Sequence, residues 1–275
     1  MVNKNIFSLK GKKSLITGGG GLLGPEHAIA LANQGSEVFL IDIDKQGLDK
    51  GSERVKKANK SAKVETFHID LKDESELKSL KNFLINKNVH IDILVNNAAI
   101  NPKMDASNNS SGKVEDYKLD NLREEIEVGL IGTFLCSKIF GSAMAKKKSG
   151  VIINIASDLA ILAPDQRVYS KNNNINTVKN FKPIGYPMVK SGMLGLNRYL
   201  ATYWAHRGIR VNCLVPGSVK NKQTKKLIKE IESRIPLSRL AKKEDYHGSI
   251  VFLASDASAY MTGQILVVDG GRSIW

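Results

Sequence analysis

A glycine-rich turn between an apolar segment and a helix-like segment constrains the fold of this chain more than any other feature. Residues 14–17 are mostly apolar, and residues 18–24 follow directly with the sequence GGGGLLG. Residues 25–32 then have a helical pattern that begins with proline, which is tolerated in a first helical turn. This order of strand, turn and helix can set backbone N–H groups against a pyrophosphate at the helix N-terminus. The alternative is a flexible turn that binds nothing.

The alternation of strand-like and helix-like segments continues along the whole chain. Short apolar runs alternate with amphipathic stretches, and Asp73 stands where an N-cap is expected. The predicted strands are residues 14–17, 37–41, 64–69, 91–95, 151–157, 209–215 and 264–268. The predicted helices are residues 25–32, 45–60, 73–86, 125–148, 186–207 and 243–254. This order predicts one α/β domain with a doubly wound parallel sheet.

Acidic residues stand at the ends of two predicted strands. Asp42 follows the second strand, where a carboxylate can hydrogen-bond the hydroxyls of an adenosine ribose. The same charge would repel a 2′-phosphate, so Asp42 favours NAD over NADP. Asp70 follows the third strand, where its carboxylate can meet the adenine amine.

Tyr186 and Lys190 are four residues apart in a predicted helix, so their side chains share one face. A free tyrosine has a pKa of about 10 and exchanges protons poorly at neutral pH. A neighbouring cation favours the phenolate and is expected to lower that pKa. The pair is therefore a candidate acid-base, although the same spacing occurs by chance in many helices.

The formal net charge of +14 raises the possibility of nucleic-acid, membrane or anionic-substrate binding. The lysines are spread over most predicted helices and loops, however, and no nucleic-acid motif accompanies them. A solvated basic surface is the simpler interpretation. We expect no nucleic-acid partner and no membrane partner.

The remaining composition favours a cytoplasmic protein without metal or redox centres. Residues 1–13 are polar and lysine-rich, and we expect no segment of membrane-spanning length. Cys136 and Cys213 lack redox or metal spacing and are expected to be free buried thiols. The five histidines are scattered, so no metal site is predicted.

Several short motifs come in the order found in the short-chain dehydrogenase/reductase family. They are Thr17-Gly18 with Gly24, Asn96-Asn97-Ala98-Ala99, Ser157, Tyr186 with Lys190, Pro216-Gly217, and the tail from Ile235 to Asp269-Gly270-Gly271. The chain resembles this family over nearly its whole length. The resemblance implies a Rossmann fold, hydride transfer with a nicotinamide cofactor, and a homo-oligomer, either a dimer or a tetramer. Glycine at positions 132, 141 and 195 would permit close helix packing in that assembly.

The resemblance also implies roles for individual residues. Tyr186 would be the acid-base, Lys190 would hold the ribose and lower the pKa of Tyr186, and Ser157 would hydrogen-bond the reacting oxygen. The residues implied at the NAD site are Gly18, Gly20, Leu23, Asp42, Asp70, Leu71, Asn97, Ala98, Tyr186, Lys190, Pro216, Gly217 and Val219.

The sequence departs from the family pattern in three places. Leu22 stands where the third glycine of the turn is usual, and Gly129 stands where a helix asparagine supports a water relay to the lysine. The family also keeps its serine and tyrosine about a dozen residues apart, which would select Tyr169. Tyr169 is followed by Asn173 rather than lysine, so we predict Tyr186 and an insertion at residues 158–185. An insertion between catalytic residues is expected to shape substrate choice, unless it is a surface excursion without contact.

Three functions remain open at this point. The first is an NAD-dependent oxidoreductase acting on a polar or anionic sugar derivative, with a basic substrate lid at residues 218–235. The turn, the insertion, Gly129 and the C-terminal Arg-Ser-Ile-Trp resemble a subgroup found with flagellin-modification and legionaminic-type sugar pathways. The second is a 3-oxoacyl thioester reductase, whose usual NADPH conflicts with Asp42. The third is a cofactor-binding scaffold or sensor without turnover.

Overall fold

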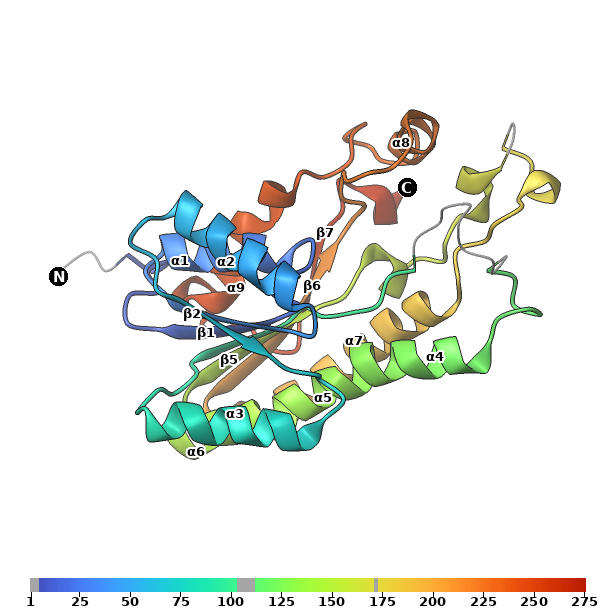
Figure 1. Ribbon diagram of the computed structural model, residues 1–275. Coiled ribbons are helices and arrows are strands. Elements are labelled where there is room, and N and C mark those ends of the chain that lie inside the picture. Colours follow the sequence, from blue (N-terminus) through green and yellow to red (C-terminus); the bar gives the residue numbers. More distant parts are fainter. Residues whose placement is uncertain (1–4, 103–111, 171–172) are drawn as a thin grey trace.

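The computed structural model describes residues 5–102, 112–170 and 173–275. Its centre is one parallel sheet of seven strands in the order β3-β2-β1-β4-β5-β6-β7, with helices on both faces (Figure 1). The chain starts in the middle at β1, winds outward to β3, crosses back to β4 and winds outward again to β7. The predicted doubly wound sheet in a single domain is therefore confirmed.

The elements lie close to their predicted positions. The first half contains β1 (Lys13–Thr17), α1 (Gly24–Asn33), β2 (Glu37–Asp42), α2 (Lys45–Ala58), β3 (Val64–His68), α3 (Glu74–Asn86) and β4 (Ile93–Asn96). The second half contains a long helix (Leu119–Lys147), β5 (Gly150–Ile155), α7 (Gly185–Trp204), β6 (Ile209–Pro216), α8 (Lys225–Glu232), α9 (His247–Ala254) and β7 (Ile265–Val268). Asp73 caps α3 as predicted, because its carboxylate accepts hydrogen bonds from the backbone of Ser75 and Glu76.

Two hydrophobic cores flank the sheet. One lies beneath α1, α2 and α9 and includes Ile16, Leu40 and Val95. The other lies beneath α3, the long helix and α7 and includes Leu15 and Trp204. Every strand from β1 to β6 pairs with parallel neighbours, so the carboxyl ends of the strands meet at one edge of the sheet.

The long helix contains α4 (Leu119–Ile126), α5 (Gly132–Cys136) and α6 (Ser142–Lys147), separated by π-helical turns at Glu127–Ile131 and Ser137–Gly141. Against our expectation, its length and mean hydropathy of 1.5 would suffice to cross a membrane. Length and composition do not distinguish such a span from a core helix, and 56% of the apolar window is buried here. Packing against α3 and α7 accounts for the apolar composition.

The insertion and the lid contact each other. The insertion forms short 3-10 turns at Asp158–Ala160, Gln166–Tyr169 and Ile175–Thr177, and the lid contains α8, a helix that the sequence pattern did not predict. Arg234 donates to Asp165 at 2.8 Å and to Asn173 at 2.7 Å. Lys226 donates to the Ser170 carbonyl at 3.2 Å. Residues 1–4, residues 103–111 and residues 171–172 of the insertion lie outside the described residues.

Candidate active site

The glycine-rich turn after β1 has a backbone that excludes larger residues. Gly18 has φ +67°, and a Cβ added there would lie 2.8 Å from the Asn97 side-chain nitrogen. A Cβ on Gly20 would lie 2.6 Å from the Gly47 backbone of α2. Gly24, the first residue of α1, packs directly on the Gly18 carbonyl. The turn thus brings bare backbone up to the α1 N-terminus.

Hydrogen bonds fix this turn to the end of β4. The Thr17 hydroxyl accepts from the backbone N–H groups of Asn97 and Ala98 at 2.9 and 3.0 Å. The Asn97 side-chain amide donates to the Thr17 carbonyl at 3.0 Å. The structure therefore places Asn97 and Ala98 beside Gly18, as the family resemblance implies.

Acidic residues also lie at this carboxyl edge. One Asp42 carboxylate oxygen accepts from the Gly20 backbone at 2.9 Å, which joins the end of β2 to the turn. The other oxygen accepts from the Asp44 backbone at 3.0 Å. Asp70 follows β3, where its carboxylate accepts from the Lys72 backbone, and the neighbouring Leu71 is buried.

The end of β6 completes the same edge. The Gly217 backbone donates to the Val268 carbonyl at 3.1 Å, and a Cβ on Gly217 would lie 2.7 Å from the Asp269 backbone. Val219, near the start of the lid, forms an isolated parallel β-bridge with Ala241. These features fit a dinucleotide that lies across the carboxyl edge of the sheet. They are the glycine turn without side chains, the half-buried Asp42 carboxylate, and the close contact between the Gly217 and Asp269 backbones.

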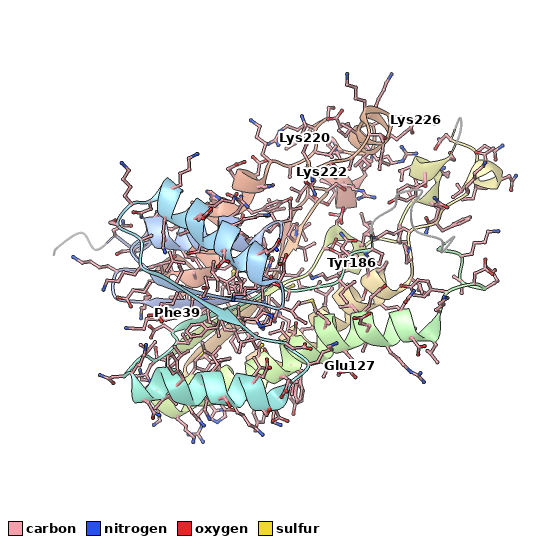
Figure 2. The ribbon with its side chains drawn as sticks, viewed as in Figure 1. Phe39, Glu127, Tyr186, Lys220, Lys222 and Lys226 are labelled. Carbon is pink, nitrogen blue, oxygen red and sulfur yellow. The ribbon has the colours of Figure 1, made fainter. Side chains whose placement is uncertain are left out.

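Ser157, Tyr186 and Lys190 converge next to this edge. Ser157 follows β5, and Tyr186 is the second residue of α7. The Lys190 ammonium is buried, donates to the Ile155 carbonyl at 2.6 Å and lies 5.7 Å from the centre of the Tyr186 ring. Figure 2 shows Tyr186 near the start of α7, between the sheet and the insertion, and its side chain is half-buried.

Burial dominates the protonation of these groups. It raises the pKa of Tyr186 to about 12, while hydrogen bonding with Ser157 acts in the opposite direction. Burial also lowers the pKa of Lys190 to about 8. The expectation that Lys190 lowers the pKa of Tyr186 is therefore wrong for this structure, because burial outweighs a cation that is directed at a carbonyl.

Lys182 is a further cation at Tyr186 that the sequence analysis missed. Its ammonium lies 4.6 Å from the centre of the Tyr186 ring and donates to the Asn101 side-chain oxygen. Lys182 is 8% exposed, and burial lowers its pKa to about 8, against the opposing influence of Glu125 and Asp158.

Glu125 brings a buried carboxylate to the start of α7. The Tyr117 hydroxyl donates to one of its oxygens, and the other oxygen has no hydrogen-bond partner among the described residues. Burial raises the pKa of this carboxyl. The unpartnered oxygen lies 2.0 Å from the position that a Cβ of Gly185 would take, so a larger residue there would displace the Glu125 carboxylate.

Asp158 links Ser157 to the C-terminal tail. The Ser157 hydroxyl donates to one Asp158 oxygen at 2.8 Å, and Arg272 donates to the other at 2.6 Å. Both members of this ion pair are buried, with side chains 12% and 5% exposed. The tail of the chain therefore supports Ser157, a connection the sequence pattern did not reveal.

Two residues singled out from the sequence lie close by. Tyr169 is half-buried in the insertion, near Arg272 and Asp158, and burial raises its pKa. Gly129 lies in the first π turn, where a Cβ would meet a Val189 methyl group at 2.5 Å. An asparagine side chain at position 129 would therefore collide with the residue that precedes Lys190.

The lysines of the lid lie on the outer surface of the protein. Lys220, Lys222, Lys225, Lys226 and Lys229 are all exposed. Figure 2 shows three of them at the outer rim of the molecule, away from Tyr186. The lysines that lie over the ring of Tyr186 are instead Lys182 and Lys190. Arg272 contacts Asp158, which in turn accepts a hydrogen bond from Ser157.

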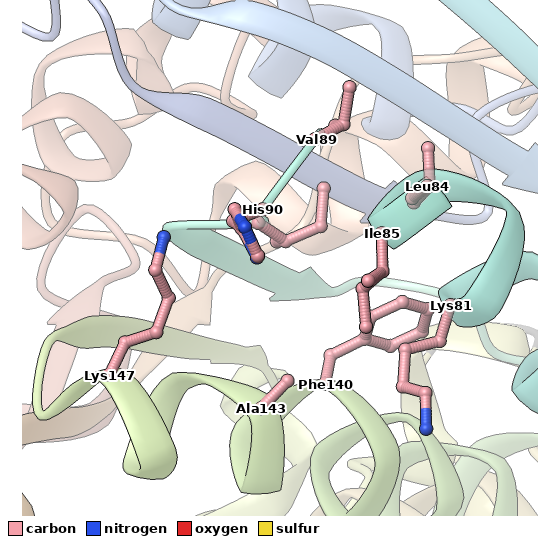
Figure 3. Close-up of a pocket in the computed structure, with 9 residues that line it drawn as sticks. Lys81, Leu84, Ile85, Val89, His90, Phe140, Ala143 and Lys147 are labelled. Carbon is pink, nitrogen blue, oxygen red and sulfur yellow. The ribbon is translucent and has the colours of Figure 1, made fainter. Parts of the chain in front are cut away.

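A separate hollow lies at the opposite edge of the sheet (Figure 3). It lies between α3 and α6, and its volume is about 310 Å³ including open solvent. Its lining includes Leu84, His90, Phe140 and Lys147. His90 precedes β4, so this hollow is remote from the carboxyl edge where the candidate active site lies.

Comparison with known proteins decides the family. A family model described as enoyl-(acyl carrier protein) reductase matches residues 23–273. The 3-oxoacyl-[acyl-carrier-protein] reductase FabG of Thermotoga maritima is 32% identical over 97% of this chain and 99% of its own. The chain is a short-chain dehydrogenase/reductase.

Two solved relatives of this dehydrogenase/reductase were determined with cofactor. A short-chain dehydrogenase from Leptospira borgpetersenii with bound NAD+ is 32% identical, with a TM-score of 0.84, over 100% of this chain and 98% of that chain. A protein assigned as an NAD(P) dependent gluconate 5-dehydrogenase from Beutenbergia cavernae, with NADP at low occupancy, is also 32% identical. Its TM-score is 0.81, over 97% of this chain and 98% of that one. Relatives thus bind either dinucleotide.

Proposed function

We propose that this short-chain dehydrogenase/reductase interconverts a secondary hydroxyl and a ketone by hydride transfer with NAD, on a polar or anionic sugar derivative. The observation that carries the proposal is the convergence of Ser157, Tyr186 and Lys190 beside a turn built for a dinucleotide. We assign Tyr186 as the acid-base, Ser157 as the hydrogen-bond partner of the reacting oxygen, and Lys190 as a ribose contact.

The cofactor would supply or accept the hydride. The chain would hold it with the turn at Gly18 and Gly20, the side chain of Leu23, the Asp42 carboxylate and Lys190. Further contacts would come from Asp70, Leu71, Asn97, Ala98, Pro216, Gly217 and Val219. In the reduction direction, Tyr186 donates its phenolic proton to the substrate oxygen. Its raised pKa keeps that proton in place at neutral pH.

We infer a preference for NAD from the position of Asp42. Its carboxylate lies beside the turn, where it can accept hydrogen bonds from the ribose hydroxyls and repel a 2′-phosphate. Because both of its oxygens already accept one backbone hydrogen bond, the carboxylate is held in this place.

The sugar substrate is supported by the polar surroundings of Tyr186. Lys182, Glu125 and Asp158 all interact electrostatically there, whereas an acyl chain would need apolar walls. The insertion would shape this choice. We also propose that the chain belongs with the flagellin-modification and legionaminic-type sugar subgroup, because its glycine turn, insertion, Gly129 and C-terminal Arg-Ser-Ile-Trp resemble that subgroup. The 3-oxoacyl thioester reductase is the second candidate, supported by the similarity to the Thermotoga maritima enzyme.

One experiment separates these functions from a scaffold without turnover. NADH oxidation is followed with a panel of keto-sugars, their phosphate or carboxylate derivatives, and 3-oxoacyl thioesters. We expect turnover with the anionic sugars. Turnover confined to the thioesters would support the second candidate. Cofactor binding without turnover on any substrate, including the reverse reaction with sugar alcohols and NAD, would support a scaffold or sensor.

We also propose a cytoplasmic homo-oligomer, dimer or tetramer. Its support is a set of exposed apolar side chains on the long helix and α7, namely Leu119, Ile131, Phe134, Met188, Tyr199 and Tyr203. The glycines expected to permit helix packing act mostly within the chain, since Gly132 packs on Leu71 and Gly141 on Trp204. Light scattering over a range of protein concentrations tests the assembly, and a monomer mass throughout would contradict it.

A further inference from the structure

Lys182 is held in place by its neighbours in the insertion. Its backbone N–H donates to the Gln166 side chain at 2.7 Å, and Gln166 donates back to the Lys182 carbonyl at 3.1 Å. This reciprocal pair fixes the peptide from which the side chain extends. The insertion therefore delivers a buried cation to one defined place.

That place is the face of the Tyr186 ring. The Lys182 ammonium is 4.6 Å from the ring centre and the Lys190 ammonium is 5.7 Å away. Lys182 also donates to the Asn101 side-chain oxygen, and Lys190 donates to the Ile155 carbonyl. A cation over an aromatic face is attracted by the electrons of the ring. The attraction grows when the phenol ionises, because a full negative charge then faces the ammonium.

Two acids lie around this pair. Asp158 is paired with Arg272, but its charge still raises the pKa of Tyr186 and so acts against Lys182. Glu125 accepts a hydrogen bond from Tyr117, and burial favours its protonated form. The remaining groups that face the site are Lys190 on α7, Cys213 on β6 and Tyr169 in the insertion.

We propose that Lys182 is a positioning residue for proton transfer, whose ammonium stabilises the Tyr186 phenolate. In the reduction direction the O–H bond of Tyr186 breaks and a new O–H bond forms on the substrate oxygen. The electron pair stays on the phenolate, where Lys182 stabilises it. The part concerning turnover rests on the proposed function, whereas ionisation of Tyr186 can be measured without any substrate.

Burial makes this support dependent on pH. The pKa of Lys182 is lowered to about 8, so the ammonium is present below pH 8 and is lost above it. An arginine at this position would keep its charge throughout. Arginine and methionine variants therefore differ chiefly in a charge beside Tyr186.

The first test is an ultraviolet titration of tyrosinate in Lys182→Arg and Lys182→Met. Each is compared with the same variant carrying Tyr186→Phe, so that the difference reports Tyr186 alone. We expect the phenolate to form at a pH lower by about one to two units in the arginine variant. Equal titrations in two variants that both retain cofactor affinity would overturn the proposal.

The second test is the pH profile of turnover on whichever substrate is active. Lys182→Met should lose about 10- to 100-fold relative to wild type below pH 8, and the two profiles should converge above it. Lys182→Arg should restore most of the rate, and Lys179→Met, an exposed lysine of the same insertion, should match wild type. A deficit constant with pH would contradict the proposal. If no substrate is turned over, the titration still decides the role of Lys182.

Discussion

Replacing Arg272 by methionine should both destabilise the protein and slow the reaction. The substitution leaves Asp158 as a buried carboxylate without its cation, since the pair is 2.6 Å long and nearly closed to solvent. Removing one partner of a buried ion pair costs about 3–5 kcal/mol. We expect a loss of this size in the free energy of unfolding, measured by urea denaturation.

The effect on rate follows from the Ser157 hydroxyl. This hydroxyl donates its single proton to Asp158, and the Arg272 guanidinium offsets part of the negative charge of the same carboxylate. Without Arg272, Asp158 becomes a stronger acceptor and holds that proton more tightly. Ser157 is then less able to donate to the substrate oxygen, and kcat should fall by about tenfold, the equivalent of one hydrogen bond.

The double variant Arg272→Met with Asp158→Asn provides the control. It removes both charges, so much of the lost stability and rate should return, and the double-mutant cycle should give a coupling energy of about 2 kcal/mol or more. Two outcomes would refute the reasoning. One is a single variant as stable as wild type, and the other is additive losses in the double variant.

Three further predictions concern single residues. Tyr186→Phe removes the transferable proton and should lower turnover by about two to four orders of magnitude without weakening NADH binding. Tyr169→Phe should change mainly the apparent substrate affinity. The reverse pattern of the two variants would make Tyr169 the catalyst. Asp42→Ala should narrow the preference for NADH over NADPH in calorimetric titrations, and tighter NADPH binding by wild type would contradict the assignment. His27 is fully buried, and burial lowers its pKa from 6.5 to about 3, so its neutral form stabilises the fold above pH 6.5 and this contribution is lost as pH falls toward 3. Between pH 6.5 and pH 4, the free energy of unfolding measured by urea denaturation should therefore fall by roughly 3 kcal/mol more in wild type than in His27→Leu. Equal losses in the two proteins would contradict this prediction.

The sheet could be predicted because its signal is local. Each strand is a short apolar run whose residues face one of two cores, as Leu15 and Ile16 do on opposite faces of β1. The glycine turn and Asp42 were also identifiable, because their positions relative to a strand end determine where they lie. α8 was missed although Leu227, Ile228 and Ile231 recur at helical spacing, because its many lysines favoured the interpretation as a basic loop. No residue of this helix is buried.

The residues around Tyr186 were harder to predict, because their contacts depend on tertiary packing between segments that are distant in the sequence. Lys182 lies in an irregular segment, and nothing in the pattern distinguishes it from the exposed Lys179. Arg272 lies more than a hundred residues from Asp158. Glu125 looks like an ordinary polar position of an amphipathic helix, yet it is buried. Their partners could be found only from the structure.

The departures from the family pattern are physically connected. A side chain at position 129 is excluded because Val189 fills its space, and Val189 stands beside Lys190 on α7. The α7 N-terminus in turn begins with Gly185, whose missing Cβ leaves room for the Glu125 carboxylate. That carboxylate interacts with Lys182, which lies over the ring of Tyr186. An asparagine at position 129 would therefore require the Val189 side chain to move. The insertion, Glu125 and the two glycines are connected by contacts around Tyr186, and we expect substitutions among them to be non-additive.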